Sequence, residues 1–497
     1  MENQYRLTCD FGSGSVKVVL CDRNYIICGA ENVPYETFFP HLGWALQKPA
    51  QHWQAFCQAT GTLIAKTGIA PAQIEGIAIA QTATTIIFTD AQGEPLTDCV
   101  MWMDGRAEQQ AQRINLMLGE QRFSGKNVIA KLLWFMENEP ELIQNTAYML
   151  DLSAYLFHRM TGEWAYEFTG ARATNLVDIP SRTWDAAMFE LIHFPRRLVP
   201  KRIAGSSEKI GVLTAAAAQA LGLAEGTPVF GGCSDHATAQ LGTGCIRPGD
   251  AHIYIGTSAW LAVSTAANDP YAGRMPSPVP GIHYHFYDTD SGGACLDQLI
   301  QIYYAKELAE GKNAFAIMNA EVQQLQTQAD DEELLFLPFL AGASAPISNV
   351  SVRASLLNIT RSTERCHIAR AVLEGICFNL RWMRDIHAEK NGWDLNFLRG
   401  IGGGMSSPVL VQMLADVLET PITPLDNPRF AGNFGLAACI DAGLRGCDDF
   451  AILDDVVRLG KTHYPDSTAA KRYHKLYHLY RQAYRALEPI YQQLNTG

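Results

Sequence analysis

The sequence predicts a mixed α/β protein built as two lobes. The chain has 497 residues, which is more than one ordinary hydrophobic core accommodates. Strand-like runs alternate with helical patterns through its first half. An opening pattern of strand, glycine turn and strand returns near Ile246. The repeat of this pattern indicates a second lobe related to the first.

The first lobe opens with a predicted antiparallel meander over residues 5–30, which contains a glycine turn and a polar turn at residues 22–24. Helical patterns follow at 49–67, 105–118 and 128–138, and strand-like runs lie at 74–80 and 85–88. A pure Rossmann domain has a different order of elements.

The second lobe is predicted to start after residue 246, where Arg247 to Asp250 interrupt the chain. Strands are expected at 251–255 and 259–263. Helices at 363–387, 406–419 and 431–443 flank a strand at 397–401, and a helical stretch at 467–494 closes the chain. The expected domains are therefore residues 1–246 and 247–497.

Composition narrows the class of protein. Apolar residues make up 47% of the chain and charged residues 18%, a balance typical of a globular enzyme. A net charge of -12 provides no general attraction for nucleic acid or anionic lipid. The 12 cysteines include no Cys-x-x-Cys pair, so neither a zinc site nor a disulfide framework is indicated. With a polar N-terminus and no 18-residue apolar run, a cytoplasmic protein is expected.

A glycine-rich turn follows Asp10, within the segment Asp-Phe-Gly-Ser-Gly-Ser-Val-Lys that ends at Lys17. Glycines such as Gly12 let backbone N–H groups approach phosphate oxygens, and an adjacent carboxylate can hold Mg²⁺ directly or through water. The alternative is an ordinary β-turn. The chain has no Gly-x-x-x-x-Gly-Lys-Ser/Thr sequence, which excludes a Walker-type phosphate loop.

Two further glycine clusters lie in the second half. Gly256, Thr257 and Ser258 repeat the turn chemistry between two strands, and Gly402 to Gly404 connect a strand to a helix. Two phosphate-binding hairpins and a nucleoside-binding loop would hold ATP. Tight packing of the backbone is the alternative for each cluster.

Asp235 follows the apolar run 228–230 and the residues Gly-Gly-Cys-Ser, and it precedes a helical run at 237–241. A carboxylate exposed at such a turn could accept a hydroxyl proton during phosphoryl transfer. The alternative is a helix cap. We interpret the neighbouring His236 as structural. We interpret His283 and His285 in the same way, because no cysteine or carboxylate stands directly beside them in the sequence to complete a metal site.

Trp102, Asp104 and Arg106 combine an aromatic plate, an acceptor and a donor, the set that stacks on a sugar and grips its hydroxyls. The alternative is a helix start capped by Asp104. Gln81 ends an apolar strand and could reach the same site.

Taken in order, these motifs resemble the FGGY carbohydrate kinases over nearly the whole chain, with a layout nearest to that of the xylulokinases. The matching segments are 10–17, 102–106, 131–134, 231–235, 256–258, 336–338, 371–375 and 402–404.

The resemblance implies an actin-like ATPase fold, with two ribonuclease H-like lobes, a central cleft, and ATP with Mg²⁺ as the nucleotide and metal. It makes Asp235 the catalytic base and Asp10 the carboxylate nearest the metal. It also assigns the sugar contacts to Gln81, Trp102, Asp104 and Asp235. The implied nucleotide contacts are Gly12, Ser13, Lys17, Gly256, Thr257, Ser258, Gly402, Gly403 and Gly404.

The sequence departs from the family pattern at several positions. After Gln81, xylulokinases usually have Met-His and glycerol kinases Arg-Glu, whereas this chain has Thr82-Ala83. The segment 342–346, Gly-Ala-Ser-Ala-Pro, lacks the acidic and basic residues of the usual Gly-Glu-Arg-x-Pro, so Ala343 replaces a glutamate. Asn358 replaces a glycine, and Val128 replaces the usual small polar residue or proline. The identity of the acceptor stays open.

The expected function is therefore ATP-dependent phosphorylation of a hydroxyl on a small sugar, such as a pentulose or another ketose, or on a polyol. The altered loop at 343–345 leaves a catalytically weak sugar or nucleotide sensor as the alternative. An actin-like chaperone ATPase is a third hypothesis, against which the Trp102 to Arg106 set argues. A homodimer is suggested by analogy alone.

Overall fold

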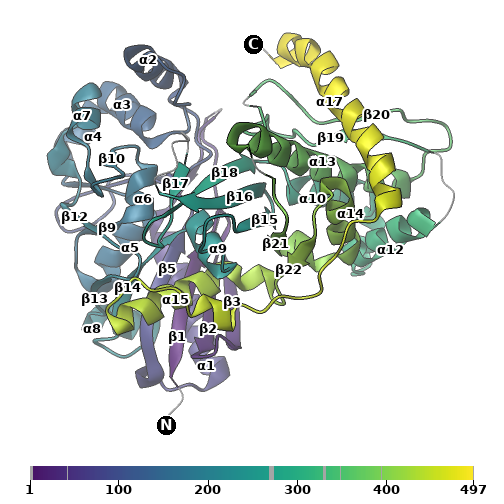
Figure 1. The fold of residues 1–497 in the computed structure, drawn as a ribbon. Coiled ribbons are helices and arrows are strands. Elements are labelled where there is room, and N and C mark those ends of the chain that lie inside the picture. Colours follow the sequence, from purple (N-terminus) through teal and green to yellow (C-terminus); the bar gives the residue numbers. More distant parts are fainter. Residues whose placement is uncertain are drawn as a thin grey trace. The chain divides into compact units, whose positions relative to one another are not determined.

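The computed structural model describes residues 4–41, 43–267, 274–327, 332–347, 349–392 and 394–495, and Figure 1 shows the fold. The chain divides into two compact units. Unit 1 comprises residues 1–244, 276–280 and 432–456, and unit 2 comprises 245–275, 281–431 and 457–497.

Unit 1 begins with the predicted meander. Strand β1 (Tyr5–Phe11) pairs antiparallel with β2 (Ser15–Asp22), and β2 pairs antiparallel with β3 (Ile27–Pro34). The full sheet has the order β13-β14-β5-β1-β2-β3, with β5 (Ile74–Gln81) parallel to both β1 and β14 (Pro228–Ser234). Both β1 and β14 therefore end at the same edge of the sheet as β5, which brings the residues that follow them together.

The elements of unit 1 not yet given include β13, an edge strand of this sheet. They are β4 (Leu46–Gln47), α1 (Pro49–Thr67), η1 (Pro71–Gln73), β6 (Ile87–Thr89), β7 (Cys99–Val100), α2 (Glu108–Leu118), α3 (Val128–Asn138), α4 (Pro140–Asn145), β8 (Tyr148–Leu150), α5 (Leu152–Thr161), β9 (Ala165–Glu167), α6 (Phe168–Ala173), β10 (Val177–Asp178), β11 (Thr183–Trp184), α7 (Ala186–Leu191), η2 (Arg196–Leu198), β12 (Arg202–Ala204), β13 (Lys209–Val212), α8 (Ala215–Leu221), α9 (Asp235–Gly242), α15 (Ala431–Arg445) and α16 (Leu453–Val456).

Unit 2 contains a second sheet of the same design. A hairpin of β15 (Ala251–Ile255) and β16 (Ala259–Ala266) is extended by antiparallel β18 (Ile282–Thr289), and β15 is joined in parallel by β21 (Leu398–Ile401). The order is β17-β18-β16-β15-β21-β22. The predicted repeat of strand, glycine turn and strand is thus confirmed, since β1–β2 and β15–β16 occupy equivalent places in their sheets.

The other elements of this part of the chain include β17 and β22, the two edge strands of the second sheet. They are β17 (Arg274–Pro276), α10 (Gly293–Tyr303), α11 (Ala305–Ala309), α12 (Ala314–Thr327), β19 (Leu335–Leu337), β20 (Ser355–Leu357), α13 (Arg365–Asn391), η3 (Gly403–Ser406), α14 (Pro408–Leu418), β22 (Ile422–Pro424), η4 (Pro428–Phe430) and α17 (Ser467–Asn495).

Most of the expected elements occur at their predicted positions. Helices α1 and α3 coincide with the predicted ranges, whereas α2 starts at Glu108 and not at residue 105. Strand β14 runs to Ser234, four residues beyond the predicted run 228–230. Its register shifts between Phe230 and Cys233, so the glycines predicted to form a turn lie instead in a β-bulge.

Helix α15 returns to unit 1 although it follows the strands of unit 2 in sequence. Leu436 and Ile440 pack with Phe230 of β14 in a small buried cluster. In the same region, Arg6 Nε donates to Asp441 Oδ1 at 2.7 Å, and both residues are buried. Charged groups this deep need such a partner, so the pair joins α15 to β1.

Candidate active site

Asp10 lies at the end of β1, next to the hairpin that connects it to β2. Its carboxylate is 27% exposed, and Lys17, its cross-strand partner, places Nζ 3.8 Å from Oδ2. The backbone N–H of Gly12 donates to the carbonyl of Ser15 at 3.0 Å, which closes the turn. The hairpin predicted from the sequence therefore forms, with Asp10 accessible beside it.

Two residues missed by sequence reasoning hold this hairpin. The hydroxyl of Tyr35 donates to the carbonyl oxygens of Gly12 and Ser15, and Gln47 Nε2 donates to the carbonyl of Ser13 at 2.6 Å. His52 bonds the other end of Gln47 at 2.7 Å, and burial lowers its pKa to about 4, so the ring is neutral at pH 7. These contacts carry no local sequence signal, because they form only after β3 and β4 fold back over the hairpin.

Trp102 links the predicted sugar loop to the predicted phosphate hairpin. Its indole Nε1 donates to Ser13 Oγ at 2.9 Å, and the side chain is half-buried. The Nζ of Lys126, an exposed residue, lies 5.5 Å from the centre of the Trp102 ring. The structure thus brings Trp102 to the edge of the sheet where β1 ends.

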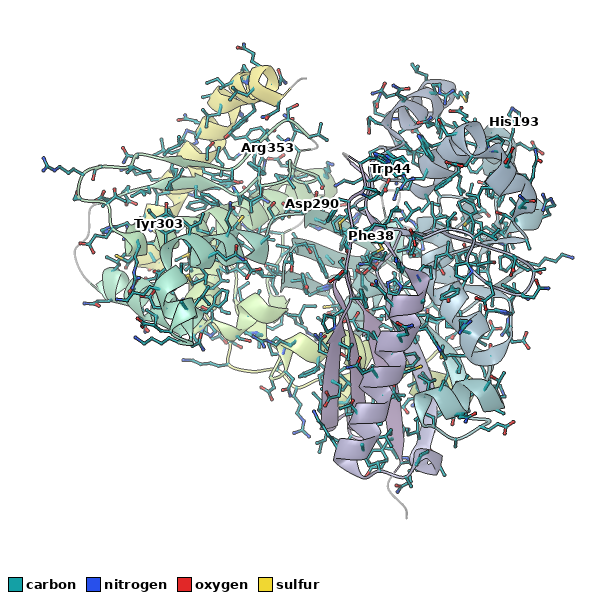
Figure 2. The ribbon with its side chains drawn as sticks, turned by 180° about the vertical axis from the view of Figure 1, so that it is seen from behind. Phe38, Trp44, His193, Asp290, Tyr303 and Arg353 are labelled. Carbon is teal, nitrogen blue, oxygen red and sulfur yellow. The ribbon has the colours of Figure 1, made fainter. Side chains whose placement is uncertain are left out.

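Asp104 is fully buried, and its carboxylate binds internal donors. It accepts from the backbone N–H of Ala45 at 2.8 Å and from Arg106 Nε and Nη2 at 2.9 and 2.8 Å. The Arg106 guanidinium in turn lies 3.5 Å from the ring centre of Trp44, which Figure 2 labels. The N-cap of α2 is Ala107, so Asp104 is not a helix cap; it orders the loop that carries Trp102.

Gln81 ends β5 and is also held inside the protein. Its Nε2 donates to Asp151 Oδ2 at 2.5 Å, and its Oε1 accepts from the backbone N–H of Ser153 at 2.8 Å. Only 1% of Gln81 is exposed. The next residue, Thr82, donates its backbone N–H to the carbonyl of Phe11 at 2.9 Å. Gln81 and Thr82 therefore join the end of β5 to α5 and to the end of β1.

Asp235 is the first residue of α9, directly after β14. The N-cap is Ser234, so Asp235 is not the cap; its Oδ1 accepts from the backbone N–H of His236 at 2.9 Å. Burial and the negative charge of Asp10 raise the pKa of Asp235 to about 7, while hydrogen bonds from the backbone of His236 and Ala83 oppose this rise. Burial lowers the pKa of His236 to about 3, so its ring is neutral.

The bulge before Asp235 requires a glycine. Gly232 has φ 62, and a Cβ there would lie 2.0 Å from the carbonyl oxygen of Ile79 in β5. This close approach lets β14 turn at the sheet edge while Cys233 and Ser234 still pair with Ala80 and Gln81. As a result Asp235 emerges at the same edge of the sheet as Asp10.

The glycine clusters of unit 2 line one cavity of 520 Å³, a volume suited to a small molecule or cofactor. Thr257 and Gly256 lie at its wall together with Gly403, Gly404 and Arg429. Apolar and amide groups complete the wall, among them Leu296, Phe315, Asn313, Asn319 and Leu373. Asn319 Oδ1 accepts from Ser407 Oγ at 2.9 Å, which orients its amide.

The hairpin at Gly256 is held by the first turn of α10. Backbone N–H groups of Gly292 and Ala294 donate to the carbonyl of Thr257 at 3.0 and 2.9 Å, and that of Gly293 donates to Gly256 at 2.6 Å. A Cβ on Gly293 would lie 2.3 Å from the Gly256 carbonyl oxygen. The Ser-Gly-Gly sequence at the start of α10 was the signal that sequence reasoning missed.

The departures from the expected motifs have structural counterparts in unit 2. Asn358 has φ 70 and its Nδ2 donates to the carbonyl of Glu333 at 2.6 Å, so an asparagine adopts the left-handed conformation that favours glycine. Ala343 exchanges backbone hydrogen bonds with Asn349 at 2.9 and 2.8 Å. The loop at 342–346 is therefore anchored through its backbone.

The part of the chain that the structure describes has neither a metal-binding cluster nor a membrane-spanning helix. Side chains of His, Cys, Asp and Glu form no group of three or more that could hold a metal ion in the described ranges. Within those ranges, no helix has both the length and the apolar character required to cross a membrane.

Comparison with known proteins identifies the class. Residues 5–242 match the N-terminal domain model of the FGGY family of carbohydrate kinases, and residues 251–439 match its C-terminal domain model. The chain therefore belongs to the FGGY family of carbohydrate kinases, which are ATP-dependent phosphotransferases. The expected actin-like ATPase fold with two domains is confirmed.

The relatives are named for different substrates. The chain is 28% identical to the xylulose kinase of Lactococcus lactis, across 99% of this chain and 98% of the relative. It is 25% identical to the gluconokinase of Bacillus licheniformis, across 99% and 97%. Among solved structures, the gluconate kinase from Lactobacillus acidophilus matches with a TM-score of 0.86 at 23% identity, covering 99% of this chain and all of that one.

Proposed function

We propose that the protein transfers the γ-phosphoryl group of ATP to a hydroxyl of a small sugar, with a ketose such as a pentulose or a polyol as the first candidate acceptor. Asp235 is the general base. The observation that carries this proposal is a half-buried carboxylate at the end of β14, whose pKa of about 7 suits proton transfer near neutral pH. Xylulose kinases and glycerol kinases among the relatives support the same acceptor class.

In this mechanism Asp235 accepts the acceptor proton as the hydroxyl oxygen attacks the γ-phosphorus, and the bond to the β-phosphate oxygen breaks. Trp102 offers its ring to one face of the sugar. Asp104 holds the loop that carries Trp102, and Gln81 fixes the end of β5 on the acceptor side. In unit 1 the hairpin of Gly12 and Ser13 would offer phosphate oxygens its turn N–H groups other than that of Gly12, which donates to Ser15. In unit 2 the hairpin of Gly256, Thr257 and Ser258 would do the same with N–H groups other than that of Gly256, which donates to Ser258. Gly402 to Gly404 would border the nucleoside.

The Asp10 carboxylate fits the role of the protein group nearest to Mg²⁺. Its carboxylate is partly exposed, and Lys17 is 3.8 Å away and not in tight ion-pair contact with it. Mg²⁺ in such enzymes takes one or two protein carboxylates together with waters and phosphates, so a three-residue cluster is not required. When bound, the ion would neutralise phosphate charge.

A sugar acid is the second candidate acceptor. Arg172 lies three residues after Thr169 in α6, on the same helix face, and its positive charge helps lower the pKa of His236 beside the base. Lys126 lies over Trp102. Two cations around the acceptor side would bind a carboxylate, and gluconokinases are among the relatives.

The decisive experiment measures ADP release by the purified protein with Mg-ATP and a panel of D-xylulose, other ketoses, glycerol, aldoses and D-gluconate. We expect one class to stimulate ADP release and Asp235→Asn to abolish the stimulation. Asp185→Asn is the matched control, because Asp185 caps α7 and asparagine caps equally well.

The results of this substrate panel distinguish the candidate functions. Stimulation by D-gluconate that Arg172→Met removes would establish the sugar acid, whereas stimulation by ketoses or polyols would establish the first candidate. Undiminished turnover by Asp235→Asn would refute the role of the base. Thermal stabilisation by ATP and a sugar without any ADP release would support the sensor alternative.

A further inference from the structure

Glu167 is a buried carboxylate that the proposed reaction does not use. It ends β9, and 1% of the residue is exposed. Four neutral donors reach it. Oε2 accepts from the backbone N–H of Thr169 and Gly170 at 2.8 and 3.1 Å and from Thr169 Oγ1 at 2.6 Å, and Oε1 accepts from Ser206 Oγ at 2.7 Å. A carboxylate buried at such cost, with this many donors, holds several chain segments together.

One of these donors reaches the residue before Asp235. The hydroxyl of Thr169 has a single proton, which it donates to Glu167. Its lone pair is therefore available to accept the backbone N–H of Ser234, which lies 2.7 Å from Thr169 Oγ1. The direction of both bonds is thus determined by the carboxylate.

The other carboxylate oxygen reaches β14 by a second route. Ser206 donates its hydroxyl to Glu167, and the carbonyl of the same residue accepts the backbone N–H of Gly232 at 2.9 Å. Gly232 and Ser234 are the residues around the β-bulge, where the regular pairing of β14 with β5 shifts register. Glu167 therefore supports both sides of the bulge that aims Asp235.

We propose that Glu167 is a positioning residue, which fixes the direction of the Asp235 carboxylate through Thr169 and Ser234. This inference rests on the proposed role of Asp235 as base. Glu167 itself touches no reacting atom. Because a displacement of about 1 Å at a reacting group can cost roughly 10²-fold in rate, loss of the Thr169 link is expected to lower turnover without altering the nucleotide cavity.

The test compares two substitutions at one position. Thr169→Val keeps the shape and removes the hydroxyl, whereas Thr169→Ser keeps the hydroxyl. With the acceptor that gives the highest rate among D-xylulose, glycerol and D-gluconate, we expect kcat to fall about 10- to 100-fold in Thr169→Val and to stay within about threefold in Thr169→Ser. The KM for ATP should stay within about twofold in both.

A second measurement needs no acceptor. Hydrogen exchange of the Ser234 backbone N–H should become at least about tenfold faster in Thr169→Val and remain slow in Thr169→Ser, since only the valine variant lacks the acceptor. Ser234 exchange that is unchanged in Thr169→Val would overturn the inference. So would an equal loss of kcat in the serine and valine variants, because that pattern reflects packing alone.

Failure of the proposed function gives a different result. If the wild-type protein releases no ADP with any acceptor while Ser234 exchange responds as expected, the hydrogen-bond relay stands and the role of Asp235 falls. If the wild type is active and Thr169→Val has the wild-type kcat, only the positioning role falls.

Discussion

The indole Nε1 of Trp102 lies 2.9 Å from Ser13 Oγ, although 89 residues separate them in the chain. The bond joins the loop expected to bind the acceptor to the hairpin expected to bind phosphate. Both lie at the edge of the unit 1 sheet where β1 and β5 end. A change at Trp102 should therefore affect the acceptor and the phosphate side together.

We predict that Trp102→Phe raises the KM for the acceptor about 3- to 10-fold, because the ring remains but the hydrogen bond to Ser13 is lost. Steady-state kinetics of Trp102→Phe, Ser13→Ala and the double variant would measure this. Since both single changes remove the same bond, the double variant should be little worse than either single one. Fully additive losses would show that the bond contributes nothing to acceptor binding.

The acid limb of the activity profile should report Asp235. A base must be deprotonated, and the pKa of this carboxyl is raised to about 7, so kcat/KM should fall as pH drops below 7, by up to about tenfold per pH unit. Initial rates from pH 5 to 9 would measure it, with Asp185→Asn expected to follow the same curve. Activity that is level down to pH 5 would contradict the assignment.

The protonation of Glu167 should change how the free energy of unfolding depends on pH. Burial raises its pKa from 4.5 to about 7, so between these values the folded protein holds a proton that the unfolded chain releases. The stability that the wild type gains from holding this proton on Glu167 is present at low pH and is lost as pH rises toward 7. Glutamine does not titrate, so the free energy of unfolding of Glu167→Gln, relative to wild type, should increase from pH 5 to pH 7.5.

Urea unfolding at several pH values would measure that difference. Asp185→Asn again serves as the control for the loss of one carboxylate. A difference between Glu167→Gln and wild type that is independent of pH would show that the carboxyl is not perturbed.

Two neighbouring glycines should respond differently to alanine. Gly402 has φ 93 and its added Cβ would lie 2.4 Å from the Ile255 carbonyl oxygen, whereas a Cβ on Gly403 meets no atom within 4 Å. We predict that Gly402→Ala lowers the free energy of unfolding by about 1–3 kcal/mol and that Gly403→Ala lowers it by less than about 1 kcal/mol. Denaturant unfolding would compare them.

The same pair tests the nucleotide site. If the Gly403 backbone borders the nucleotide, its methyl group should weaken ATP binding several-fold while stability is kept, as measured by calorimetry. Equal stability of the two variants would contradict the packing argument, and unchanged ATP affinity in Gly403→Ala would remove Gly403 from the site.

The long periodic helices and the glycine hairpins could be predicted because their signals are local. Helix α1 has proline at its first position and a left-handed glycine, Gly68, after its last residue. The end of β14 was predicted less well. Glycines usually indicate a turn, but here Gly232 permits a bulge against Ile79, and the strand continues to Ser234.

The sequence by itself determined the two related sheets and the order of the motifs, because hydrophobic period and turn chemistry act over a few residues. Only the tertiary structure decided that α15 joins unit 1 through Arg6 and Asp441, and that Glu167 reaches Ser234 through Thr169. Buried polar groups must find partners wherever the folded chain brings them. Those partners come from distant segments, so no local pattern records them.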